Sequence, residues 1–109
     1  MATVVTEALV DIGIERKRQI SDEGFMPEDD NILSGGVLAR MGACYARHAA
    51  NYRGQAPYPP PLSMYSAEDA DEDWPGPREF WKPSDPRRDL VKAAALIVAE
   101  IERMDRGIA

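Results

Sequence analysis

Residues 81–92 read WKPSDPRRDLVK and encode the start of a helix. Pro86 suits the first helical position, where a missing N–H costs no hydrogen bond, and Ser84 or Asp85 can accept from the free amides that follow. Those amides and the positive end of the helix dipole also attract phosphate or carboxylate. Four cations near this start can add charge and forked hydrogen bonds: Lys82, Arg87, Arg88 and Lys92. The stretch therefore predicts a helix start that is also an anion site.

Three windows of the chain show helical periodicity: residues 4–20, 35–52 and 86–106. Apolar residues recur there at intervals of three and four, which places them on one helix face. We expect the third helix to be central. Its apolar stripe consists of Leu90, Ala94, Ile97, Ile101 and Met104, and Val91, Leu96 and Val98 widen it. Gly42 and several alanines give the second window a small-residue face, which is typical of close helix packing or of a dimer seam. The predicted fold class is all-α with three principal helices.

A long proline-rich and acidic insertion separates the second helix from the third. Residues 54–84 contain seven of the nine prolines, and proline interrupts both helices and β-ladders. An irregular segment of this length in a small domain is typically disordered or functional. We therefore expect a single helical domain over residues 1–109, in which residues 54–80 form an irregular, partly mobile insertion. Three aromatic residues favour order at its C-terminal end: Trp74, Phe80 and Trp81.

Composition narrows the classes of function. The formal charge of −6 argues against a general nucleic-acid binder, which needs a basic face. No apolar run approaches the roughly 18 residues of a membrane span, and the N-terminal residues lack a secretory pattern. Cys44 is the single cysteine, so no internal disulfide forms, and we expect a cytoplasmic protein. Because a chain of 109 residues leaves much apolar surface near water, we expect a homo-oligomer that associates through the second and third helices.

The chain also contains the residue types of a nucleotide-sized pocket. The cations that could hold phosphates are Arg16, Arg18, Lys82, Arg87, Arg88 and Lys92. The carboxylates that could take ribose hydroxyls or base amines are Glu15, Glu23, Asp29 and Asp30. The rings on which a base could stack are Phe25, Tyr45 and Trp81. The alternative is that these charges pair with one another as a solvated polar surface, for example Glu15 with Arg18.

Two other arrangements would point to an enzyme. Helical nucleoside triphosphate pyrophosphohydrolases hold Mg²⁺ with an ExxE pair and a later ExxD pair. Glu102 and Asp105 form an ExxD, but no ExxE precedes it. Cys44 and His48 lie one helical turn apart, yet no third group orients the imidazole, which favours a buried structural thiol. We therefore expect no catalytic residue, no metal site and no cofactor, with Mg²⁺ needed only in the hydrolase alternative.

A longer pattern links several of these residues: ERxRQ at 15–19, EG at 23–24, DD at 29–30, WKPxDxRRDLVKA at 81–93 and AEIER at 99–103. With this pattern the chain resembles a small family of phage and prophage proteins over most of its length outside the insertion. The resemblance implies a phage-encoded accessory role in the host cytoplasm and implies no reaction.

The resemblance and the pocket residues together predict a non-enzymatic protein that binds a nucleotide or another phosphate-bearing small molecule. For a phage, such a protein would sequester a nucleotide immune signal that the host produces. The first alternative is a Mg²⁺-dependent helical nucleotide pyrophosphohydrolase. The second is a protein-interaction module that acts on a host protein.

Overall fold

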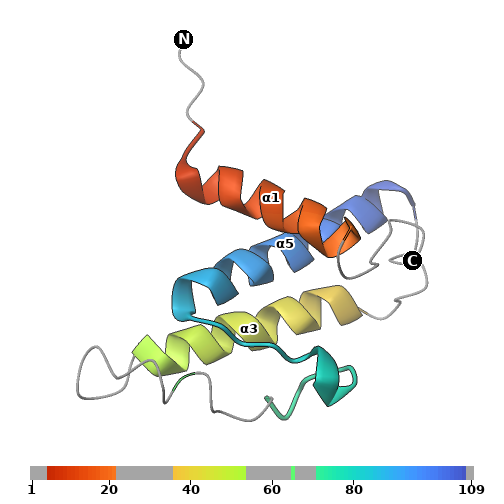
Figure 1. Cartoon of the computed structure of the whole chain (residues 1–109). Coiled ribbons are helices and arrows are strands. Elements are labelled where there is room, and N and C mark those ends of the chain that lie inside the picture. Colours follow the sequence, from red (N-terminus) through yellow and green to blue (C-terminus); the bar gives the residue numbers. More distant parts are fainter. Residues whose placement is uncertain (1–4, 22–35, 54–64, 66–70, 108–109) are drawn as a thin grey trace.

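The computed structural model describes residues 5–21, 36–53, 65 and 71–107 (Figure 1). Within these ranges the chain forms three α-helices and one turn of 3-10 helix: α1 Glu7–Ser21, α3 Val37–Arg53, η1 Arg78–Phe80 and α5 Pro86–Asp105. No strand occurs in the described ranges, so the all-α prediction with three principal helices is confirmed. None of the helices in these ranges is long and apolar enough to cross a membrane.

Helix α5 lies between α1 and α3 and packs against both (Figure 1). The apolar core lies where α3 meets α5 and consists of Leu38, Met41, Tyr45, Ala93, Leu96 and Ala99. The end of the insertion passes over α3 and brings Trp74 and Trp81 against this core. Residues 71–85 before α5 are irregular apart from η1, as the prolines predict, whereas residues 54–64 and 66–70, on which the expected mobility falls, lie outside the described residues.

The face that α5 turns inward is not its most apolar face. Between 43% and 63% of the surface is exposed at Leu90, Ile97, Ile101 and Met104. The buried face combines three alanines, four charged residues and two larger apolar residues: Asp89, Val91, Lys92, Ala93, Ala95, Leu96, Ala99, Glu100 and Arg103. Small side chains let a neighbouring helix come close, and the charged ones are tolerated because they have partners, such as Arg103 with Glu100 at 3.1 Å. The apolar stripe that the sequence predicts is therefore divided: Val91 and Leu96 are buried, whereas Leu90, Ile97, Ile101 and Met104 stay exposed in the single chain.

Gly42 explains how closely α3 approaches α5. A Cβ atom at this position would lie 3.0 Å from the backbone oxygen of Ala93 and 3.3 Å from Cγ1 of Ile97. The small-residue face of α3 therefore serves close helix packing within one chain at this point. Gly13 on α1 differs, because no atom lies within 4 Å of a Cβ added there.

We expect Gly42→Ala to destabilise the fold by about 1–3 kcal/mol, because the added methyl meets a helix carbonyl that moves only with its backbone. Gly13→Ala is the matched control. It should stabilise the fold by up to about 1 kcal/mol, since alanine forms helices better than glycine and the space is open. Equilibrium unfolding in urea measures both changes. Equal stabilisation by the two variants would show that α3 and α5 tolerate a wider spacing.

A second copy of the chain is the partner that we expect on the exposed stripe of α5. By helical spacing, no charged residue interrupts this stripe from Leu90 to Met104, whereas the whole chain carries a formal charge of −6. Two copies that meet through this stripe therefore bring no charged residues of the stripe together. The stripe is a candidate surface for self-association, and the predicted homo-oligomer stays a prediction.

We predict that Ile101→Glu shifts the protein to a monomer at micromolar concentration without lowering the stability of that monomer, because the side chain is 50% exposed within one chain. Light scattering measures the mass. Asn51→Glu, at an exposed position on α3, introduces the same charge and should leave the mass unchanged. A wild-type protein that is already monomeric at this concentration would contradict the prediction.

Candidate functional site

A groove lined by four cations lies where α1 and α5 meet the short segment before α5. We call this segment, residues 81–85, the strap. The groove has a volume of about 380 Å³, and its lining consists of Arg18, Lys82, Pro83, Ser84, Arg88 and Lys92. The structure thus brings together four of the six cations that the sequence suggests as phosphate ligands. We refer to this feature as the cationic groove.

The start of α5 forms as its sequence predicts. Asp85 is the N-cap, and its side chain accepts a hydrogen bond from the amide of Arg88 at 2.9 Å, while Pro86 begins the helix. Asp89 accepts from the amide of Ser84 at 3.0 Å. Two carboxylates of the chain therefore occupy backbone amides at this helix start. An anion that enters the cationic groove meets side-chain cations rather than these two amides.

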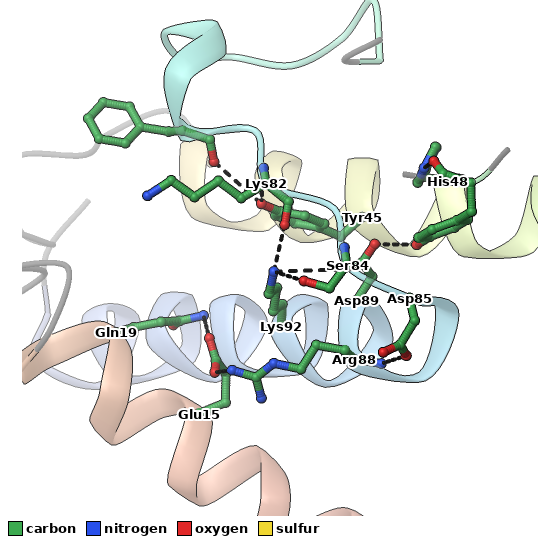
Figure 2. A network of polar contacts seen from close by, with 12 residues as sticks. Glu15, Gln19, Tyr45, His48, Lys82, Ser84, Asp85, Arg88, Asp89 and Lys92 are labelled. Atoms are coloured by element: carbon green, nitrogen blue, oxygen red, sulfur yellow. Dashed lines mark hydrogen bonds and ion pairs between the residues drawn. The ribbon is translucent and has the colours of Figure 1, made fainter. Parts of the chain in front are cut away.

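A fully buried carboxylate holds the α1 side of the groove (Figure 2). Glu15 accepts two hydrogen bonds from Arg18 at 2.8 Å, one from Gln19 at 3.2 Å, and one from Arg88. Burial alone would raise the pKa of Glu15, but these hydrogen bonds and the charges of both arginines lower it below its ordinary value. The structure therefore contains the pairing of Glu15 with Arg18, in which the carboxylate is buried and the guanidinium is partly exposed.

Lys92 contributes an ammonium group that is almost buried, with 9% of the residue exposed. The ammonium donates to the carbonyl oxygen of Lys82 at 2.6 Å and to the hydroxyl of Ser84 at 3.0 Å (Figure 2). It also lies 3.8 Å from the carboxylate of Asp89. Burial lowers the pKa of Lys92, and the charge of Asp89 opposes this shift. Lys92 therefore fastens the strap to α5 and fixes one wall of the groove.

Tyr65 is a member of the site that sequence reasoning missed. Its hydroxyl donates to the carboxylate of Asp89, and both residues are buried. Burial raises the pKa of Asp89, and burial together with the hydrogen bond to Asp89 raises the pKa of Tyr65. The backbone oxygen of Tyr65 lies 3.0 Å from Nε2 of His48 on α3. No signal in the sequence singles out this tyrosine, because it stands in the proline-rich insertion without periodic neighbours.

A smaller pocket, which we call the inner pocket, adjoins the groove and shares Arg18, Lys82 and Lys92 with it. The rest of its lining consists of Glu15, Gln19, Met41, Tyr45, Trp74, Phe80 and Leu96. Its volume of about 30 Å³ suits one or two water-sized groups. Gln19 is 3% exposed, and its carbonyl oxygen has no hydrogen-bond partner in the described part of the chain. Since Glu15 fixes the amide nitrogen of Gln19, this oxygen is a buried acceptor that would suit a ligand donor.

Trp81 belongs to an aromatic cluster beneath the strap. Its ring stacks on Tyr45 with centroids 4.7 Å apart and meets Trp74 edge to face at 5.2 Å. The hydroxyl of Tyr45 accepts from the amide of Lys82 at 3.0 Å, which holds the strap over α3. Phe80 is 45% exposed at the inner pocket. A planar ligand group would therefore reach Phe80 more easily than Trp81.

The other predicted ligand residues lie outside the cationic groove. Arg16 pairs with Glu102 at 2.9 Å, which ties α1 to the far half of α5. Arg87 pairs with Asp11 on α1 at 2.9 Å. Asp11 lies one helical turn before Glu15, which is the partner of Arg88. Four further residues lie outside the described residues: Glu23, Phe25, Asp29 and Asp30.

The residues considered for an enzyme have other surroundings. In the described ranges, no group of three or more histidine, cysteine, aspartate or glutamate side chains could hold a metal ion. Glu102 of the ExxD pair is engaged by Arg16. Cys44 is buried, and burial raises the pKa of its thiol, which disfavours the thiolate that a nucleophile needs.

We expect Glu15→Gln to lower the unfolding free energy by about 3 kcal/mol at pH 7, because it leaves two guanidiniums beside a neutral amide. The pKa of Glu15 is lowered in the fold, so its contribution is present above the ordinary value of 4.5 and is lost as pH falls through the folded value. The difference in unfolding free energy between wild type and variant should therefore become smaller at acidic pH. Urea unfolding at neutral and acidic pH measures it, with the exposed Glu79→Gln as control. A variant as stable as the wild type at pH 7 would contradict this role.

Comparisons with known proteins do not indicate what the groove binds. No protein-family model matches the chain, and no curated protein or solved structure is significantly similar to it. The chemistry of the site therefore has to come from the residues that line it.

Proposed function

We propose that the cationic groove binds a phosphate-bearing small molecule, with a nucleotide as the candidate ligand. The observation that carries this proposal is the convergence of four cations from α1, the strap and α5 on one groove of about 380 Å³. The groove is open, so a ligand that binds there would keep part of its surface in solvent. The chain has a formal net charge of −6, so a groove lined by four cations differs from the average charge of the chain. Such a concentration of positive charge attracts phosphate.

Lys82 is the cation most open to a ligand. Its side chain is exposed, and no carboxylate in the described part of the chain forms an ion pair with its ammonium. Arg88 also has capacity left, because a guanidinium carries five N–H donors and the structure shows one of them bound to Glu15. These two side chains stand on different segments, so a phosphate can bridge the strap and α5.

The inner pocket supports a ligand that extends beyond its phosphate. Phe80 offers an exposed ring, which could stack against a base. The pocket itself is too small for a base, since its volume of about 30 Å³ admits only one or two water-sized groups. A nucleotide would therefore place its base against Phe80 and its phosphate among the cations.

Sequestration of a host immune nucleotide extends this proposal and rests on the resemblance to phage and prophage proteins. Three of the four cations, Arg18, Arg88 and Lys92, contact buried carboxylates before any ligand arrives, so binding requires little reordering of these side chains. A preorganised site of this kind favours tight retention of its ligand. Retention without turnover is what sequestration requires.

The test is to incubate purified protein with mono-, di- and cyclic nucleotides and to measure free nucleotide before and after heat denaturation. Depletion before heating and recovery of intact nucleotide afterwards would support binding without cleavage. A product that forms only with Mg²⁺ would contradict this function and favour a hydrolase. If no nucleotide and no inorganic pyrophosphate binds, the proposal fails and an interaction module acting on a host protein is favoured.

We predict that Lys82→Ala weakens nucleotide binding about tenfold, which corresponds to about 1.4 kcal/mol, and leaves the melting temperature unchanged. Lys17→Ala is the matched control, because Lys17 is exposed on α1 and does not line the groove. Arg88→Ala is less informative, since it also removes a partner of the buried Glu15. Titration calorimetry gives the affinities, and equal weakening by both lysine variants would point to a diffuse charge effect instead of a site.

A further inference from the structure

The inner pocket contains a buried acceptor that lacks a donor. Gln19 on α1 lines this pocket and is 3% exposed. Within the described ranges, its carbonyl oxygen Oε1 has no hydrogen-bond partner. A buried polar atom without a partner costs free energy, and such atoms in folded proteins usually meet ordered water or a ligand. Oε1 of Gln19 therefore marks a place for a donor that the described residues do not supply.

The neighbouring carboxylate fixes the orientation of the Gln19 amide. Nε2 of Gln19 donates to Oε2 of Glu15 at 3.2 Å (Figure 2). A glutamine can in general turn its amide by half a turn, and then it donates where it accepted before. In this site the turn would place Oε1 against the buried carboxylate of Glu15 with no proton between the two oxygens. Gln19 therefore offers the pocket an acceptor and not a donor.

The size of the inner pocket limits what can reach this acceptor. Its volume of about 30 Å³ admits one or two water-sized groups, so a hydroxyl or an amino group fits and a ring does not. Apart from Gln19 and its charged neighbours, the lining is apolar or aromatic: Met41, Tyr45, Trp74, Phe80 and Leu96. A small donor at the end of a larger ligand matches this shape and this chemistry.

The position of the pocket connects it to the cationic groove. Arg18, Lys82 and Lys92 line both, so a group in the pocket and a phosphate in the groove can belong to one molecule. The proposed function assigns these cations to the phosphate. Gln19 is then the acceptor that remains for the rest of the ligand.

We propose that the inner pocket is a subsite for a hydrogen-bond donor of the ligand and that Gln19 recognises this donor. The donor is the amino group of a base or a hydroxyl of the ribose. This proposal rests on the proposed function and names the part of the ligand that enters the pocket. A ligand without the donor leaves Oε1 unpaired and loses affinity. A ligand carbonyl in the same place would meet Oε1 with no proton between the two oxygens.

The experiment compares three nucleotides by titration calorimetry. Adenosine 5′-monophosphate carries both candidate donors. Purine riboside 5′-monophosphate lacks the amino group, and 2′,3′-dideoxyadenosine 5′-monophosphate lacks the ribose hydroxyls. All three carry the same phosphate, so the cationic groove contributes alike to each. We expect one of the two deletions to weaken binding about tenfold, and that deletion identifies the donor.

Gln19→Met tests the acceptor itself, because methionine has a similar length and no carbonyl oxygen in its side chain. We expect the affinity for adenosine 5′-monophosphate to fall to that of the weaker analogue, so that their ratio becomes about one. Loss of the hydrogen bond to Glu15 affects all three nucleotides through the phosphate, and the ratio cancels this effect. Lys17→Met is the matched control, since Lys17 is exposed on the same helix and lines neither cavity. It should leave the ratio unchanged.

The wild-type comparison decides alone if Gln19→Met does not fold. Equal affinity of the three nucleotides for the wild type, or a ratio that persists in a folded Gln19→Met protein, would overturn the inference and leave the proposed function standing. Binding of inorganic pyrophosphate without any of the three nucleotides would also overturn it. If no nucleotide and no pyrophosphate binds, the inference and the proposed function both fail.

Discussion

The carboxylate of Glu15 has no access to solvent, and a charge in that position is stable only with partners close at hand. Arg18 on the same helix and Arg88 on α5 provide those partners, so one cluster of charges both neutralises Glu15 and docks α1 on α5. Apolar contacts do less for this helix, since between 46% and 60% of the surface is exposed at Leu9, Val10 and Ile14. The position of α1, and with it one wall of the groove, therefore depends on a polar contact.

Asp89 has a corresponding role at the other end of the groove. It accepts from Tyr65 and from the amide of Ser84, and it lies beside the ammonium of Lys92. The contacts that stabilise these two buried carboxylates are thus the contacts that position the cations. The same interactions therefore stabilise the fold and fix the side chains of the groove, in a small chain without a large apolar core.

Local chemistry explains what the sequence could predict. Asp85 and Pro86 predict the start of α5, because capping involves only neighbouring residues. The three helices can be predicted from periodicity over 15 to 20 residues. The inward face of α5 could not be predicted in this way, since periodicity identifies an apolar face but not the helix that will pack on it. Glu15 and Arg88 stand 73 positions apart, and no local rule pairs them. The same holds for Tyr65 and Asp89, which only the fold brings together.

The contact at Gly42 has a consequence for the inner pocket. Met41 precedes Gly42 on α3, Lys92 precedes Ala93 on α5, and both Met41 and Lys92 line that pocket. The spacing of the two helices at Gly42 therefore also affects how far apart these two lining residues lie. A larger residue at this position would act as a spacer and widen the pocket from outside it. The size of the group that the pocket admits thus depends partly on the lack of a side chain at Gly42, a residue that does not line the pocket.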